Sequence, residues 1–420
     1  MANTNARQNW RYFVLHGLFY SLKRKLAPPH VFLPFIAVAV GAPALLSAVI
    51  VPIFTLFSRG FELISAPIVS NAKQRKHYVS VGIVAIGMGL LFAIAAAEFS
   101  ASIFTIACLV LSALVIGIGQ GIGGVAYTSL LPSLFNRQLR RNLLNLVGVI
   151  SAGGAIALAV ATYYVFLQGD PLKSHLALIW LAVLMAIPAA LLMLPVYEPV
   201  RHSQPFDTED EPGQNKAKWT HFVGRFAVCW RQGWFRQYLI MIILLLSVRQ
   251  VMPFYAIHAS SLHKHQSGAF ASLVVAMSIG ELLSGPIIHR LSSRSVGTNM
   301  AIAILAAMTA AVIALMTDLL LKEPQFYYYM PVIVLVALAS QIVGVSLMVY
   351  LGEVTDENSR EYFVASSRTV EGGVGIAVTA LLGLLIEIHN ESVPIMIILG
   401  FNLAALVFVM WTLPEQERAA

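Results

Sequence analysis

ELISAPIV, at residues 62–69, returns 219 residues later as ELLSGPII, at residues 281–288. Five of the eight positions are identical, and they include a glutamate and a proline that an oily composition alone would not supply. Further matches follow in the same order, namely Gln120 with Gln341 and Gly153-Gly154 with Gly372-Gly373. Ordered matches at nearly one spacing indicate that the chain consists of two homologous halves.

The composition predicts an all-α membrane protein. Of the 420 residues, 58% are hydrophobic and 11% are charged, and the mean hydropathy is +0.78. A soluble domain of this length needs a more polar surface. Apolar runs of about 20 residues, the length with which a helix crosses a bilayer, recur along the chain. We therefore expect a multi-pass integral membrane protein surrounded by the lipid bilayer.

Twelve membrane-spanning helices fit these runs, six in each half. We expect residues 1–197 to form the N-terminal half, residues 198–235 a polar cytoplasmic linker and residues 236–420 the C-terminal half. Basic clusters such as KQRK (73–76) and RQLRR (137–141) lie between spans on one side only. The positive-inside rule places these clusters and both termini in the cytoplasm. This distribution explains the net charge of +7 without a nucleic-acid partner, and it fits a plasma membrane, such as a bacterial inner membrane.

Two arginines occupy matching places in the halves, because Arg24-x-x-x-Pro28 recurs as Arg249-x-x-x-Pro253. Arg249 follows an apolar run, so the repeat predicts that both arginines lie deep in the membrane. The alternative is an interfacial helix over residues 8–25 that keeps its cations in water. A cation at the bilayer centre costs at least about 2.5–3.5 kcal/mol and persists only beside a wet cavity or a partner. We expect no carboxylate at comparable depth in spans 1 or 7, so an anion is the predicted occupant.

The remaining polar residues of the spans extend this predicted anion site. The planar guanidinium of arginine suits a bidentate phosphate or carboxylate. Consecutive helix residues lie about 100° apart, so only one of Lys23 and Lys25 is expected to flank the cavity beside Arg24. The predicted substrate-binding residues are Arg24, Arg249, Lys25, Lys23, Tyr20, Gln120, Gln341 and Tyr127. For the two glutamines and Tyr127, hydrogen bonding between helices is the alternative role.

The chain resembles the major facilitator superfamily over nearly its whole length. The resemblance rests on two six-helix halves, a long central loop and basic loops after spans 2 and 8. Members carry G-x-x-x-D-R-x-G-R-R in these loops, where this chain has APIVSNAKQRK (66–76) and GPIIHRLSSRS (285–295), without the aspartate and the second glycine. More narrowly, Tyr20-x-x-x-Arg24-Lys25 with Arg249 resembles the organophosphate:phosphate antiporter branch. That resemblance implies a pair of arginines that binds a phosphoryl group.

Spans 2 and 11 pack across the interface between the halves in this superfamily. Arg59 and Glu62 share one face of span 2, and Arg368 and Glu371 share one face of span 11. We expect these four residues to form a cytoplasmic gate, the alternative being two separate pairs within their own helices. Partly buried carboxyl groups are also candidate proton carriers, namely Glu62, Glu281 and Glu371.

These features predict a secondary active transporter that moves a small organic or phosphorylated anion by alternating access. We expect a monomer that exchanges or co-transports an ion such as a proton or phosphate. The sequence contains neither a P-loop nor an HExxH motif, so we expect no enzyme activity, cofactor or metal. The alternatives are a proton-coupled exporter of drugs or metabolites and a non-transporting receptor or scaffold on the same fold.

Overall fold

The computed structural model describes residues 2–417 apart from 71, 99–102, 136, 166–170, 199–229, 264–268, 292–294, 321–326, 328, 355–359, 389 and 391. The described residues form helices and contain no strand. The first group of helices comprises α1 (Ala2–Leu26), α2 (Pro29–Ala39), α3 (Ala44–Ser70), α4 (Lys76–Glu98), α5 (Ile103–Leu134), α6 (Arg137–Val165) and α7 (Pro171–Leu191). The second comprises α9 (Gly233–Arg249), α10 (Met252–His263), α11 (Ala269–Leu291), α12 (Val296–Leu320), α13 (Met330–Val354), α14 (Arg360–Ile388) and α15 (Ser392–Glu417). Most of the expected linker lies outside the described residues.

One span in each group is broken, and the two breaks lie at positions that the repeat pairs. The first breaks between α1 and α2, and the second breaks between α9 and α10. Pro28 has an extended backbone (φ −71°, ψ 119°), and Pro29 follows at the first turn of α2. Proline has no N–H and disfavours the helical conformation in the residue before it, so it ends one helix and fits the start of the next. Pro253 holds the matching place in α10.

If each broken pair counts as one segment, the described helices form twelve segments of span size. Ten of these segments are long and apolar enough to cross a membrane. The segment of α1 and α2 is not among the ten, and it carries the three cations Lys23, Arg24 and Lys25 at the break. In α6 the apolar part is limited to Leu146–Thr162, because the helix begins with basic residues.

Glycines bring the helices of the first group into close contact. A β-carbon at Gly82 of α4 would lie 2.6 Å from the carbonyl oxygen of Gly119 and 2.7 Å from Cα of Gly123. On another side of α5, a β-carbon at Gly121 would lie 2.6 Å from the carbonyl oxygen of Ser58 in α3. The glycines of GIGQGIGG (117–124) therefore allow backbones to approach, as small residues do in membrane helices.

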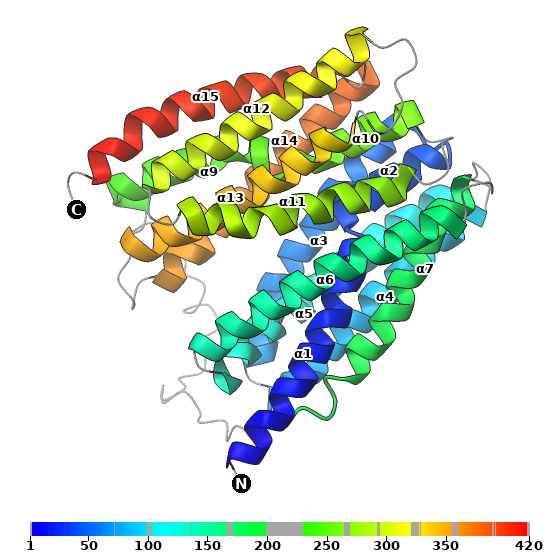
Figure 1. The fold of residues 1–420 in the computed structure, drawn as a ribbon, viewed down its shortest axis with the longest axis vertical. Helices are drawn as coiled ribbons and strands as arrows, with labels where there is room; N and C mark the ends of the chain where they lie inside the picture. Colours follow the sequence, from blue (N-terminus) through cyan, green and yellow to red (C-terminus); the bar gives the residue numbers. More distant parts are fainter. Residues whose placement is uncertain are drawn as a thin grey trace, which may run out of the picture.

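The two groups meet most extensively through three helix pairs, α3 with α14, α6 with α11, and α2 with α10. They converge around α2 and α10 and diverge towards the ends where the chain termini lie (Figure 1). At the convergent end, Ser260 of α10 donates a hydrogen bond of 3.2 Å to the carbonyl oxygen of Phe35 in α2. All residues from 251 to 260 are buried there. The two groups are thus in contact at this end, and their helices separate towards the termini (Figure 1).

Candidate functional site

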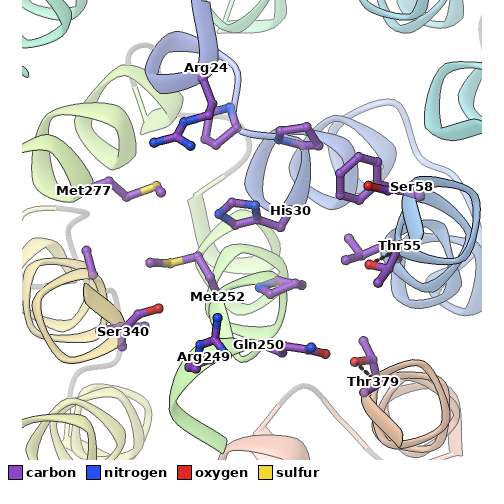
Figure 2. A pocket seen from close by; sticks show the side chains of 18 of the residues that line it. Arg24, His30, Thr55, Ser58, Arg249, Gln250, Met252, Met277, Ser340 and Thr379 are labelled. Atoms are coloured by element: carbon purple, nitrogen blue, oxygen red, sulfur yellow. Dashed lines mark hydrogen bonds between the residues drawn. The ribbon is translucent and has the colours of Figure 1, made fainter. Parts of the chain in front are cut away.

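A cavity of about 330 Å³ lies between the two groups where α1 and α9 end. Both halves supply its walls, and the side chains of Arg24, His30 and Arg249 lie around it in Figure 2. Several residues from the sequence analysis line it, namely Arg24, Lys25, Arg59, Gln120, Arg249, Glu281 and Gln341. The two matching arginines therefore face one chamber, as the repeat predicts.

The helix breaks explain why cations are tolerated here. Lys23, Arg24 and Lys25 form the last turn of α1, and Arg249 is the last residue of α9. The last carbonyl groups of a helix carry a partial negative charge, which favours cations in the final turn. Half-helices that end inside a membrane protein place such termini at binding sites. The sequence locates the cations, and the structure adds the helix ends that stabilise them.

The expectation of an uncompensated positive field is wrong. Lys25 forms an ion pair with Glu281 of α11, and Arg249 forms one with Glu371 of α14. Spans 1 and 7 themselves contain no carboxylate, and the partners come from neighbouring helices. Glu281 lies within the apolar segment Ala269–Ile288 of α11, from which its side chain reaches Lys25 at the end of α1.

Of the two intrahelical pairs that are the alternative to the gate, one is present among the described residues. Nη1 of Arg59 lies 3.0 Å from Oε2 of Glu62. Glu371 instead is buried and binds Arg249, while Arg368 is exposed. Arg59 also reaches the other half: a β-carbon at Gly372 of α14 would lie 3.4 Å from its Cγ. One side of the expected gate is therefore an intrahelical pair, and the other side is bound to α9.

Lys23, Tyr20 and Tyr127 do not line the cavity. Lys23 is 4% exposed, and its Nζ lies 4.4 Å from the centre of the Tyr20 ring. Tyr20 stacks on Tyr127 at 6.5 Å and on His16 at 5.9 Å. These residues form an aromatic cluster inside the first group of helices. Lys25 is thus the lysine that flanks Arg24 in the cavity.

Arg24 differs from the other cations of the cavity. Lys25, Arg59 and Arg249 each have a carboxylate partner. Among the described residues, Arg24 has none, and its side chain is exposed to the open cavity. The cavity thus has four cations, Arg24, Lys25, Arg59 and Arg249, and three of them are paired with the carboxylates named above. One positive charge, at Arg24, is not neutralised by a described residue.

Several polar residues of this cavity were not predicted from the sequence. The most informative are His30 at the start of α2 and Gln250 in the break after α9. Gln250 is the repeat counterpart of Lys25, which could have identified it. Its side-chain amide lies so close to Gly375 of α14 that a β-carbon there would collide with it. The hydroxyl groups of the lining belong to Thr55, Ser58, Ser278, Ser340 and Thr379.

The described residues contain no cluster of His, Cys, Asp and Glu that could hold a metal ion. What the cavity offers is a set of cations, carboxylates, amides and hydroxyl groups in a chamber between two helix groups. Such a chamber can bind a polar solute and release it on either side if the groups rock against each other.

Comparison with known proteins supports this view of the chamber. The sequence model of the Major Facilitator Superfamily matches residues 17–379. The chain belongs to the Major Facilitator Superfamily. It is a membrane transporter of that type, and the family and the apolar segments agree with the predicted multi-pass protein of the plasma membrane.

Relatives in sequence include uncharacterized proteins of Mycobacterium tuberculosis (strain H37Rv) and Mycobacterium bovis. Each is 23% identical over 399 residues, which cover 94% of this chain and 75% of the relative. These matches carry no information about a substrate.

Solved structures share the fold at low sequence identity. The nucleoside transporter NupG has a TM-score of 0.68 at 13% identity and covers 97% of this chain and 98% of its own. A POT family transporter in complex with a thioalcohol-conjugated peptide has a TM-score of 0.71 at 12% identity and covers 98% and 96%. A bacterial homologue of the human lysosomal transporter Spinster, in an inward-facing and unoccupied conformation, has a TM-score of 0.61 at 13% identity and covers 96% of each chain. These structures are of transporters and not of enzymes.

Proposed function

We propose that this superfamily member is a secondary active transporter for a small polar solute with a phosphate or carboxylate group. The observation that carries the proposal is Arg24, an exposed guanidinium in the central cavity without a carboxylate partner among the described residues. An arginine fork binds these anions through two parallel hydrogen bonds. The amides and hydroxyl groups around it suit a solute with further hydrogen-bonding groups.

Arg249 has a different role from Arg24 in this proposal. Its guanidinium is bound to Glu371, so an anion that recruits Arg249 must compete with that carboxylate. The proposed site therefore contains one arginine that is ready for the anion and a second that becomes available when Glu371 is released. This revises the sequence-based expectation of two equivalent arginines.

Transport in this proposal follows from rocking of two six-helix halves across twelve spans, with both termini in the cytoplasm. In this proposal the contact between α2 and α10 lies on the outer side of the membrane, and the halves separate towards the termini on the cytoplasmic side (Figure 1). The opposite conformation requires α2 to separate from α10 and the terminal ends to close. A gradient of the solute, of an exchanged anion or of protons supplies the energy.

A flux measurement tests this function. Ligand stabilisation of the purified protein against phosphate esters, dicarboxylates and inorganic anions first identifies a solute. Proteoliposomes then measure its uptake by the native chain, by Arg24→Gln and by Arg24→Lys. We expect saturable uptake that is lost in Arg24→Gln and weakened in Arg24→Lys. Equal uptake by Arg24→Gln and the native chain contradicts the proposal, and binding without flux favours a receptor.

The ion pairs of the cavity favour a second candidate, a proton-coupled exporter. Glu281 and Glu371 each neutralise a cation in the cavity wall, so protonation of either carboxyl would free that cation. In that case the transported solute leaves the cell when protons enter. Efflux of a cationic drug from proteoliposomes under an imposed pH gradient, unaffected by Arg24→Gln, would favour this candidate over anion transport.

A further inference from the structure

A second cavity, of about 660 Å³, lies on the outside of the first group of helices, and it shares no residue with the central cavity. It is formed where α3 ends and α4 begins, with one residue from α5. Its lining comprises Ser65, Ile68, Ala72, Lys73, Gln74, His77, Tyr78, Val81 and Ile122. We call it the α3–α4 groove.

One part of the α3–α4 groove is apolar and open to the surroundings. Ile68 and Val81 are 51% and 56% exposed, and Ile122 of α5 lines the same groove. Val81 and Ile122 lie in apolar segments long enough to cross a membrane, and Ile68 lies six residues beyond the apolar segment of α3. Apolar side chains exposed on the outer surface of such segments face hydrocarbon. This part of the groove is therefore suited to an acyl chain.

The other part of the α3–α4 groove is polar and cationic. Lys73 and His77 are exposed, and Nε2 of His77 lies 2.9 Å from Oε1 of Gln74. Lys73 has no acidic partner among the described residues. The connecting segment APIVSNAKQRK (66–76) contains no acidic residue that could neutralise it. A free ammonium group next to an apolar groove is what an anionic lipid head group requires.

Two further cations next to the groove are held in fixed positions. Nη1 of Arg75 donates to the carbonyl oxygen of Ser129 at 2.6 Å. Nζ of Lys76 donates at 2.8 Å to the carbonyl oxygens of Leu194 and Val196. The local carboxylate is Glu198, which accepts the backbone N–H groups of Arg75 and Lys76 at 2.8 and 3.1 Å. Among the described residues, the basic side chains of Lys73, Arg75 and Lys76 thus lie near one carboxylate, and Lys73 is the one of the three without a hydrogen-bond or ion-pair partner there.

We propose that the α3–α4 groove binds one anionic phospholipid. The phosphate lies against Lys73 and His77, and one acyl chain lies along Ile68, Val81 and Ile122. The excess of positive charge favours a lipid with net negative charge over a zwitterionic lipid of the same chain length. This inference depends on the membrane-spanning fold and not on the substrate proposed for the central cavity.

Native mass spectrometry of the full chain tests this lipid site. The purified protein is titrated with phosphatidylglycerol and with phosphatidylcholine of identical acyl chains. We expect the native chain to retain phosphatidylglycerol preferentially. Lys73→Gln should lower that affinity about fivefold, the factor expected from the contribution of one lysine near a membrane surface. Val81→Trp, which fills the apolar part, should lower the binding of both lipids.

The matched control is Arg290→Gln, which removes an exposed cation at the corresponding end of α11. We expect it to leave phosphatidylglycerol binding unchanged. An equal loss of phosphatidylglycerol affinity in Lys73→Gln and Arg290→Gln would show a diffuse electrostatic effect and overturn the proposal. Competition by water-soluble glycerol phosphate at the concentration of the lipid would also overturn it, because the groove would then bind a free anion. Stabilisation by the solute of the central cavity should be the same in Lys73→Gln and the native chain.

Discussion

Lys25, at the end of α1, forms an ion pair with Glu281 of α11 and so connects the two halves across the central cavity. The side chains are 8% and 23% exposed, so the pair is largely shielded from solvent. Loss of one partner from such a pair leaves a charge without compensation. The pair is therefore a determinant of both stability and conformation.

We expect Lys25→Met and Glu281→Gln each to destabilise the protein by about 3 kcal/mol, and the double variant to be less destabilised than the sum. Thermal unfolding of the native chain, the two single variants and the double variant in detergent measures the coupling energy between Lys25 and Glu281. The control cycle is Arg59→Met with Glu62→Gln, an intrahelical pair of more exposed side chains (37% and 26%) whose coupling should be about 0.5 kcal/mol. Additive effects in the Lys25 and Glu281 cycle would contradict a direct ion pair.

Arg24 and Arg249 should respond differently to the same substitution. Arg24→Gln removes a cation without a carboxylate partner, so we expect unchanged or slightly raised thermal stability. We expect the affinity for the ligand, measured by its stabilisation of the protein, to fall at least tenfold. Arg249→Gln leaves buried Glu371 without its partner, so we expect lower stability as the first effect. Thermal unfolding with and without ligand separates the two. Equal loss of binding at unchanged stability in both variants would restore the view of two equivalent arginines.

The sequence predicted the repeat, the superfamily and the convergence of Arg24 and Arg249 on one chamber. These predictions were possible because charged and polar residues at matching positions of the two halves are easily recognised in a mostly apolar chain. It did not predict the ion pairs, since these depend on which neighbouring helix faces each cation. Glu371 illustrates the difference: helical spacing pairs it with Arg368, but its burial against α9 pairs it with Arg249. Likewise, Tyr20 lies one turn from Arg24 yet packs against Tyr127.

Gly375 should be required for the shape of the cavity. A side chain at this position would displace the amide of Gln250, which lies in the break between α9 and α10. We expect Gly375→Val to reduce solute flux at least tenfold while the protein still folds, because the end of a flexible side chain can move. Gly373→Val is the matched control, since nothing lies within 4 Å of a β-carbon there. Normal flux in Gly375→Val would show that Gln250 has no role in the cavity.

The contact between α4 and α5 should be sensitive to a small change in volume. A β-carbon at Gly82 would meet backbone atoms of Gly119 and Gly123 at 2.6–2.8 Å, and backbone cannot move aside as a side-chain end can. We expect Gly82→Ala to destabilise the protein by about 1–3 kcal/mol and Gly82→Val to destabilise it further. Gly148→Ala on α6, where nothing lies within 4 Å, should be neutral or slightly stabilising because alanine favours helix. Thermal unfolding in detergent compares the three variants, and equal stability of Gly82→Ala and Gly148→Ala would exclude the close backbone contact.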